Sequence, residues 1–249
     1  MPLYRLLKQI TKQVLPERWL FRYEPAIRKL FALSYRGKQF HCNICQAGLS
    51  KFVELPTGDL LCPFCGSLPR NRRLWELLQE RGFLKGRVLD FSPPGCLYRI
   101  MENRKNMEYL STDFAGEFRA HRSYDITRIE EPDSSFDLII CFHVLEHVED
   151  DGAAMRELFR VLKKNGKALI QTPFREGDIF EDNTIRSPED RLKFFGQKDH
   201  VRVYSVEGLK ARLAQAGFSV EVWGYPLQKD LPVEIRKGKA EGAILIASR

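Results

Sequence analysis

From residue 86 onward, short apolar segments typical of strands alternate with segments typical of helices. The segment FDLIICF at 136–142 is almost wholly apolar, and KALIQTP at 167–173 has the apolar centre of another buried strand. Strands that are apolar on both faces are typical of a parallel sheet covered by helices on both sides. Seven segments fit this pattern: GRVLDF, MEYLSTDF, SYDIT, FDLIICF, KALIQTP, SVEVWGY and EGAILIASR. The sequence therefore predicts an α/β fold with a mostly parallel sheet over residues 71–249.

Helices are expected between these strands. The segment DDGAAMRELFRVLKKNG should form a helix that Gly166 ends, and residues 70–84 should form another that ends at Gly82. Residues 174–204 are polar and irregular, and they are too long for an ordinary loop. We therefore expect residues 174–204 to form a lid.

Four cysteines occur in two pairs, Cys42-x2-Cys45 and Cys62-x2-Cys65, with sixteen residues between the pairs. In a chain without a secretion signal, such pairs indicate metal binding rather than disulfides. Two turns that each present two thiolates give the tetrahedral ligand set of zinc, with no coordination position left open. We expect a structural zinc ribbon over residues 36–70; four buried or redox-active cysteines are the alternative.

The positive charge of the chain is concentrated at its N-terminus. Residues 1–38 contain nine Lys and Arg against Glu17 and Glu24, whereas the whole chain has a net charge of +7, so the remaining residues balance to zero. Residues 1–35 also carry apolar side chains at helical spacing, and Pro16 and Pro25 should divide this arm into about three short helical pieces. Such an arm could bind an anionic membrane or an acidic partner, or pack on the body with its basic face in water.

No run of 18 apolar residues occurs, and the first residues are charged at intervals, unlike a signal peptide. We therefore expect a cytoplasmic protein, in which the basic arm offers the place for any peripheral membrane contact.

The predicted strands point to a cofactor site. In an open parallel sheet, ligands bind outside the carboxyl ends of the strands. The first strand ends at Asp90, and the second ends about twenty residues later at Asp113, a position that suits a ribose hydroxyl. Between them, the sequence Ser92-Pro93-Pro94-Gly95 stands where a glycine-rich loop would be expected. With only one glycine, this loop allows few close backbone contacts and is poorly suited to bind a pyrophosphate. A cofactor without phosphates, such as S-adenosylmethionine, needs fewer close contacts with backbone amides.

The order of these segments resembles a class I S-adenosylmethionine-dependent methyltransferase of the type 11-like group. The resemblance rests on VLDFSPPG, YLSTD, YDIT, SFDLIICFHVLEHVEDD and ELFRVLKKNGKALIQTPF, and covers roughly residues 70–249. The segments CPFCGSLPRNRRLW and FGQKDHVRVYS are also similar to a bacterial group of zinc-ribbon methyltransferases. The resemblance implies a Rossmann-like, seven-stranded, mostly parallel sheet with a small N-terminal zinc-ribbon domain.

The resemblance also implies roles for individual residues. Asp90, Ser92 and Gly95 would line the methionine end of the cofactor, around the end of the first strand. Asp113, at the end of the second strand, would bind the ribose, and Asp125 and Ile126, near the third, would lie by the adenine. Cys141, Phe142 and His143, around the end of the fourth strand, would face the reacting centre. The Ser-Pro-Pro loop departs from the family pattern, so we expect a stiffened form of this loop.

The sequence His143-Val-Leu-Glu146-His147 also matches the inverted zincin pattern H-x-x-E-H. Its place directly after a buried strand argues against a hydrolase. Two interpretations remain. These three side chains could bind a divalent ion that orients an oxygen substrate, or Glu146 and His147 could brace the loop while His143 alone faces the pocket.

Methyl transfer to oxygen or nitrogen can require a base. His143 is the first candidate and His200, on the predicted lid, is the second. Arg202 could bind an anionic substrate or belong to an ion-pair network. Because the body carries no net charge, we favour a small-molecule or glycan-like acceptor. One alternative is an RNA methyltransferase that docks RNA with its zinc ribbon and basic arm; another is a non-catalytic cofactor-binding scaffold.

Overall fold

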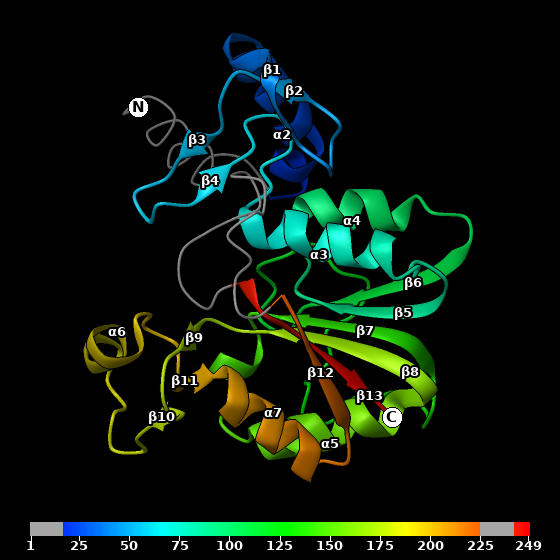
Figure 1. Ribbon diagram of the computed structural model, residues 1–249, viewed down its shortest axis with the longest axis vertical. Helices are drawn as coiled ribbons and strands as arrows, with labels where there is room; N and C mark the ends of the chain where they lie inside the picture. The colour runs from blue at the N-terminus through cyan, green and yellow to red at the C-terminus, as the bar shows by residue number, and fades with distance from the viewer. Residues whose placement is uncertain (1–16, 225–241) are drawn as a thin grey trace.

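The structure is a computed structural model that describes residues 17–224 and 242–249. The apolar positions that predict helix in the first sixteen residues, and Pro16 itself, lie outside the described residues. Figure 1 shows a central sheet with helices on both faces and a smaller N-terminal part above it. The predicted α/β class is therefore observed.

The described residues contain one central six-stranded sheet, whose strands are β5 Gly86–Phe91, β6 Met107–Thr112, β7 Phe136–Phe142, β8 Leu162–Gln171, β12 Ser219–Trp223 and β13 Ile244–Ser248. Their order across the sheet is β12-β13-β8-β7-β5-β6. Strand β5 pairs in parallel with both β6 and β7, and β7 pairs in parallel with β8. Strand β13 runs antiparallel to its two neighbours. The carboxyl ends of β5, β6 and β7 therefore meet at one edge of the sheet.

The sequence predicts seven strands for this sheet, whereas the described sheet has six. The segment SYDIT, residues 123–127, forms no strand: isolated bridges join Thr112 to Arg122, just before the segment, and Asp125 to Arg128. The carboxylate of Asp125 accepts hydrogen bonds from the backbone N–H and the hydroxyl of Thr127, at 2.8 and 2.7 Å. This local bonding turns the chain, and the turn ends the pairing with β6 after a single bridge.

The helices cover the two faces of the sheet (Figure 1): α3 Pro69–Glu80 and α4 Gly95–Glu102 lie on one face, and α5 Asp151–Val161 and α7 Val206–Gln215 on the other. The residues of β7 show why both faces are covered. Leu138 and Ile140 belong to the hydrophobic cluster that includes α3, whereas Ile139 and Cys141 belong to the cluster that includes α5. Because side chains alternate along a strand, an unbroken apolar strand serves both layers.

The helix predicted to end at Gly166 ends five residues earlier. Leu162 already has an extended backbone and pairs with Phe136 of β7. Both side chains are fully buried, so packing holds Leu162 in the sheet although the two lysines that follow it are good helix formers. Strand β8 therefore begins at Leu162.

The N-terminal part contains two small antiparallel sheets, in which β1 Arg36–His41 pairs with β2 Gly48–Leu49, and β3 Val53–Glu54 pairs with β4 Leu60–Leu61. Before them lie helix α2 Glu17–Ala32 and the 3-10 helix η1 Leu33–Tyr35. Helix α2 continues through Pro25, so the prediction that Pro25 divides the arm is wrong. A single proline removes one backbone hydrogen bond. Glu24 pairs with Arg28 within α2 and with Arg99 of α4, each at 2.7 Å, and these contacts hold the helix.

Residues 174–204 are more regular than predicted. They contain β9 Phe174–Arg175, β10 Phe180–Glu181, helix α6 Pro188–Phe195 and most of β11 Arg202–Ser205. The three strands form a sheet of their own in the order β10-β11-β9. Ser187 caps α6 by accepting a hydrogen bond from the backbone N–H of Asp190. The segment is polar because its helix and strands are short and lie at the surface. Figure 1 shows α6 and β9–β11 together at one side of the central sheet.

Across the described part of the chain, no helix has both the length and the hydropathy that a membrane span requires.

Candidate functional site

The loop after β5 brings two predicted cofactor residues into contact. Ser92 has a φ of 49°, a left-handed conformation that usually favours glycine. Its backbone N–H donates to the carbonyl of Thr112 at 2.8 Å, and its hydroxyl donates to Oδ1 of Asp113 at 2.7 Å. Serine therefore stands in the place of a glycine and stabilises the strained turn through a bond that glycine could not make.

Asp113 lies just beyond β6, where the sequence predicts a ribose contact. The side chain is buried, and its Oδ2 accepts the backbone N–H of Phe118 at 2.9 Å. Each carboxylate oxygen therefore has one fixed donor, and each keeps a lone pair for a further donor. Such a fixed, acceptor-only group is suited to bind a pair of hydroxyls.

Asp90 is the residue before the last in β5, the strand that leads into the Ser92 loop, and its carboxyl lies deeper. Only 2% of its surface is exposed, and its Oδ2 accepts the hydroxyl of Tyr109 at 2.8 Å. Burial raises the pKa of Asp90 to about 7. Gly95 is the first residue of helix α4, next to Pro94, so this predicted residue lies where the loop joins the helix.

The two residues predicted to lie near the adenine differ in their exposure to solvent. Asp125 is exposed and holds its own turn, whereas Ile126 is buried in the hydrophobic cluster that includes α5. The backbone N–H of Tyr124 donates to the hydroxyl of Thr112 at 2.7 Å, which places this segment beside the end of β6. Asp125 can thus face a ligand there, while Ile126 supports the segment from below.

Three predicted residues follow one another at the end of β7. Phe142 is half-buried, and His143 has a φ of 56° with its backbone N–H bonded to the carbonyl of Gln171 at 2.8 Å. Backbone strain of this kind is often found at functional sites. Cys141 is fully buried within the core, and burial raises its pKa. The expectation that Cys141 faces the reacting centre is therefore wrong.

The motif H-x-x-E-H does not form the zincin arrangement. Residues Leu145–His147 form a short 3-10 helix, η2, so His143 and His147 do not lie one turn apart on an α-helix. The structure instead brings His200 to Glu146 and His147, with one ligand atom of each within 4.8 Å of the others. Both predicted catalytic histidines, His143 and His200, thus lie close to Glu146, whose Oε1 is 3.4 Å from Nδ1 of His143.

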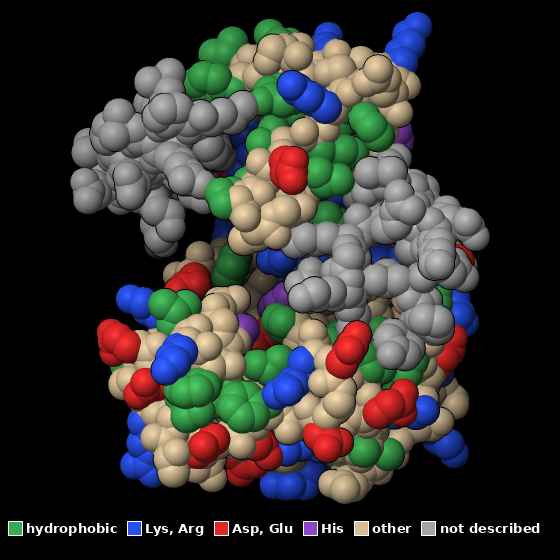
Figure 2. Space-filling view, turned by 60° about the vertical axis from the view of Figure 1, so that its left-hand side comes forward, with side chains coloured by type: hydrophobic (Ala, Val, Ile, Leu, Met, Phe, Trp, Pro, Cys, Tyr) green, Lys and Arg blue, Asp and Glu red, His purple; other side chains and the backbone are tan. Residues whose placement is uncertain are grey.

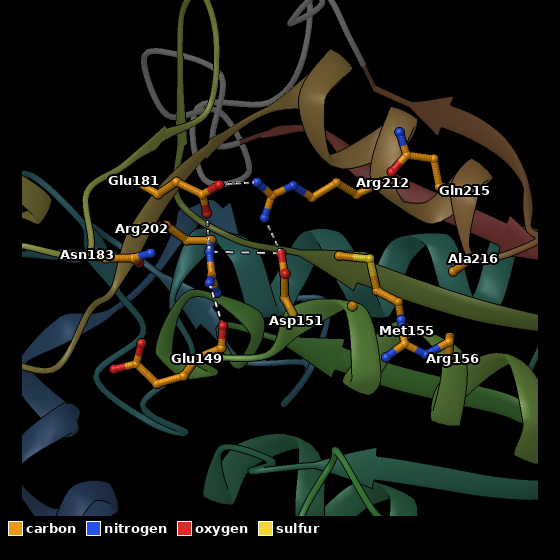
Figure 3. A pocket seen from close by; sticks show the side chains of 11 residues that line it. Glu149, Asp151, Met155, Arg156, Glu181, Asn183, Arg202, Arg212, Gln215 and Ala216 are labelled. Atoms are coloured by element: carbon orange, nitrogen blue, oxygen red, sulfur yellow. Dashed lines mark hydrogen bonds and ion pairs between the residues drawn. The ribbon is translucent and has the colours of Figure 1, made fainter.

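Arg202 serves the structure rather than an anionic substrate. Its buried guanidinium donates to the backbone carbonyls of Leu145, Val148 and Glu149 and to Oε2 of Glu181. Figure 3 shows these contacts with Glu149 and Glu181. The ion-pair interpretation is therefore the better one, and Arg202 fixes the turn that carries Glu146 and His147.

A cavity of about 550 Å³ adjoins this network. Figure 3 shows Arg212 between Glu181 and Asp151, and the bond from Arg212 to Oδ2 of Asp151 is 2.6 Å long. The same Asp151 oxygen accepts the hydroxyl of Tyr204. None of the predicted cofactor residues lines this cavity, and its main charges neutralise one another, so we do not assign it to the cofactor.

The four cysteines of the N-terminal part converge. The sulfur atoms lie within 4.8 Å of one another, with 3.7 Å between Cys42 and Cys65 and between Cys45 and Cys62, and all four are free of disulfides. Four sulfurs at zinc–sulfur distances of about 2.3 Å from a tetrahedral centre would be about 3.8 Å apart. The donor set and its spacing therefore fit a zinc ion.

The two cysteine turns share one backbone design. The N–H groups of Gln46 and Gly66 donate to the carbonyls of Cys42 and Cys62, at 2.8 and 2.9 Å, and both donors have positive φ values. Each turn thus closes one residue after its second cysteine. Ser67 was not predicted: its hydroxyl lies 3.5 Å from the sulfur of Cys42 and 3.2 Å from that of Cys65. Its position directly after CPFCG is the signal that could have identified it.

Comparison with known proteins identifies the sheet domain. A family described as a methyltransferase domain matches residues 67–221. An uncharacterized methyltransferase of Bacillus subtilis, YcgJ, is 30% identical over 102 residues, which are 40% of this chain and 39% of that protein. A protein of Mycolicibacterium smegmatis named as a probable S-adenosylmethionine-dependent methyltransferase is 29% identical over 106 residues, 40% of this chain and 35% of its own length. The chain thus spans about two fifths of the length of these relatives.

Among solved structures, the crystal structure of YcgJ from Bacillus subtilis is similar, with a TM-score of 0.50 and 20% sequence identity. The similarity covers 72% of this chain and 99% of that chain, and it supports the Rossmann-like fold of the sheet domain.

Proposed function

The chain belongs to a family of methyltransferase domains, and we propose that it transfers a methyl group from S-adenosylmethionine to an oxygen or nitrogen atom of a small-molecule or glycan-like acceptor. The observation that carries the donor assignment is the hydrogen bond between Ser92 and Asp113, at the carboxyl ends of β5 and β6. It gives the Ser-Pro-Pro loop a fixed form next to an acceptor-only carboxylate. A ribose diol suits that carboxylate, and the loop needs no phosphate contact.

The proposed chemistry is an in-line displacement. Bound S-adenosylmethionine supplies a sulfonium methyl group, so the bond from sulfur to the methyl carbon breaks, S-adenosylhomocysteine leaves, and a new bond forms to the acceptor atom. His143 Nε2 is buried without a hydrogen-bond partner. We assign it to receive the proton that the acceptor loses, while Glu146 Oε1 lies at the other ring nitrogen.

His200 is the second candidate base. Burial lowers its pKa, so its imidazole is neutral near pH 7 and can accept a proton. We expect His143→Asn to reduce turnover more than His200→Asn, because His143 is the first candidate for the base.

Charge supports a small or glycan-like acceptor. Figure 2 shows Lys and Arg side chains interspersed with Asp and Glu over the lower half of this face. An RNA-binding face would gather positive charge along the path of the phosphates. The excess positive charge of this chain lies in residues 1–38, which keeps RNA as the alternative acceptor.

The N-terminal part has a separate proposed role. We assign a structural Zn²⁺ to Cys42, Cys45, Cys62 and Cys65, because four thiolates saturate the ion and leave no position for substrate. Cys42 and Cys62 are completely buried. The ion would hold β1–β4 together and so support the surface on which α3 packs.

The acceptor assignment is tested by measuring S-adenosylhomocysteine production. Zinc-loaded protein and its His143→Asn variant would be incubated with hydroxyl- and amine-bearing metabolites, with oligosaccharides, and with transfer and ribosomal RNA. We expect turnover with a member of the first two groups and a loss of at least tenfold in the variant. Turnover with RNA alone would favour the RNA methyltransferase, and no turnover by protein that binds the cofactor would favour the scaffold.

A further inference from the structure

Three side chains that lie outside the proposed cofactor site meet beyond the carboxyl end of β7. Glu146 and His147 belong to η2, and His200 comes from the loop between α6 and β11, more than fifty residues later. One potential ligand atom of each lies within 4.8 Å of the others. Figure 2 shows histidine side chains in the hollow between the upper and lower parts of the molecule.

Glu146 is the most unusual member of this cluster. Its side chain is 1% exposed, and neither carboxylate oxygen has a hydrogen-bond partner. The nearest cationic candidate is Nδ1 of His143, at 3.4 Å from Oε1. A buried carboxylate without partners is strongly unfavourable, so such groups are normally paired, hydrogen-bonded or bound to a metal.

The two histidines are held as metal ligands commonly are. His147 places Nδ1 3.0 Å from Oδ2 of Asp199. The ring of His200 has an electrostatic contact with the backbone of Phe195, while its Nε2 is buried without a partner. In metal sites, the nitrogen that does not bind the ion usually donates to a carboxylate or a backbone carbonyl, which orients the ring. Both histidines have such a second contact.

The two segments of the cluster are fastened to each other by backbone contacts. The N–H of Val201 donates to the carbonyl of Glu146 at 2.9 Å, and Arg202 donates to the carbonyls of Val148 and Glu149. The positions of the three side chains are therefore set by the fold, independently of any ion. A site held in advance in this way binds an ion without first ordering the chain.

We propose that Glu146, His147 and His200 form a binding site for a divalent first-row transition-metal cation. Two imidazoles and one carboxylate suit Mn²⁺, Fe²⁺, Co²⁺ or Zn²⁺ better than Mg²⁺ or Ca²⁺, which prefer all-oxygen sites. Three protein ligands leave coordination positions open, unlike the four cysteines. The ligand set replaces His143 of the sequence-based interpretation by His200, and it leaves His143 beside the ion.

The open positions suggest a use that rests on the proposed methyl transfer. A cation there would bind an oxygen of the acceptor and hold it near Nε2 of His143, and it would favour loss of the hydroxyl proton. Metal binding itself does not depend on this use, because it follows from the three side chains alone.

The test uses full-length protein whose four-cysteine site is already loaded with zinc. Mn²⁺ is the probe, because it competes poorly for thiolates and its free form is measured by electron paramagnetic resonance. We expect the wild-type protein to bind one Mn²⁺ per chain. Glu146→Gln and His200→Gln should each weaken this binding at least tenfold, since each removes one of three ligands.

Glu149→Gln is the matched control, because Glu149 lies in the same turn with an exposed carboxylate that pairs with Arg191. Its Mn²⁺ binding should equal that of the wild type. If a variant fails to fold by circular dichroism, Co²⁺ added to the zinc-loaded wild type gives a second measurement, in which nitrogen and oxygen ligands produce weak visible bands without thiolate charge transfer.

Wild-type protein that binds neither Mn²⁺ nor Co²⁺ at millimolar concentration would overturn the proposal, and so would equal binding by all three variants. S-adenosylhomocysteine binding, measured on the same samples, reports separately on the methyltransferase assignment. A protein that binds S-adenosylhomocysteine but no metal would therefore refute the metal site alone.

Discussion

Ser92 occupies a conformation that sequence reasoning assigns to glycine, and its neighbours explain why serine is accepted there. The order of the predicted strands indicates that Ser92, Gly95 and Asp113 lie at one edge of the sheet. The direct bond between Ser92 and Asp113 could not be predicted, because it depends on the positive φ of Ser92. Likewise, the contact between Asp90 and Tyr109 joins adjacent strands whose register no short motif specifies.

Two substitutions at Ser92 should have unequal effects on stability. Ser92→Gly loses the hydroxyl but relieves the left-handed strain, whereas Ser92→Ala loses the hydroxyl and keeps the strain. We expect Ser92→Ala to be less stable than Ser92→Gly by about 1 kcal/mol in urea unfolding. Equal stability of the two variants, or the reverse order, would contradict the strained conformation.

Asp90 should make stability depend on pH. Its pKa in the folded protein is raised to about 7, so the folded state holds a proton that the unfolded state releases at lower pH. The resulting stability is complete below the ordinary carboxyl pKa of about 4 and is lost as the pH rises through about 7. We expect the free energy of unfolding of Asp90→Asn, relative to wild type, to rise by about 2–3 kcal/mol from about pH 5 to pH 8.

Tyr109→Phe provides the control for this titration. The Tyr109 hydroxyl bond lowers the pKa of Asp90 against the larger effect of burial. Its removal should shift the loss of stability to higher pH. A difference between Asp90→Asn and wild type that does not change with pH would refute the buried, neutral carboxyl.

At the scale of elements, apolar strands were the most predictable part of the chain. FDLIICF matches β7 at 136–142, and GRVLDF matches β5 at 86–91, because both are bounded by turn residues and buried on two faces. The end of α5 and the regular elements within 174–204 were mispredicted. There, tertiary packing of Leu162 and the pairing of β11 with β9 and β10 outweigh local composition.

Arg72 of α3 should control how firmly zinc is held. Its fully buried guanidinium donates to the carbonyls of Ser67 and Leu60, at 2.7 and 2.8 Å, and lies over the ring of Phe52. Arg72→Met would leave both carbonyls without these donors, at a cost of about 1–3 kcal/mol each. We expect zinc to pass to a chromogenic chelator at least tenfold faster than from wild type.

Arg81→Met is the control for this experiment, since Arg81 lies at the end of the same helix but pairs with Glu221 in a largely exposed contact. Its zinc release should match that of the wild type. Equal rates for Arg72→Met and wild type would show that α3 does not support the cysteine turns.

For the whole molecule, the N-terminal part that carries the four cysteines shares one hydrophobic cluster with the sheet domain. Cys42, Leu49 and Phe52 pack in the same cluster as Leu74 and Trp75 of α3, which also reaches Leu169 of the sheet. The predicted boundary between residues 70 and 71 falls within the first turn of α3. The sequence indicated two units, but their continuous core depends on long-range contacts that spacing does not reveal.

Zinc removal should therefore destabilise the sheet domain as well. Chelation in the presence of a mild denaturant should lower the melting temperature recorded at tryptophan, because the cluster around Trp75 loses the packing of Cys42 and Phe52. The thermal transition should remain single. Two transitions, with the upper one unchanged by chelation, would contradict the shared core.

We propose that this chain binds S-adenosylmethionine at the carboxyl ends of β5 and β6, and calorimetric titration with S-adenosylhomocysteine measures binding at that place. Wild type should bind with a micromolar dissociation constant. Asp113→Asn should bind at least tenfold more weakly, while Glu207→Gln, an exposed carboxyl on α7, should bind like wild type. Folded wild-type protein that binds neither S-adenosylhomocysteine nor S-adenosylmethionine, or an Asp113→Asn variant that binds as tightly as wild type, would contradict the assignment.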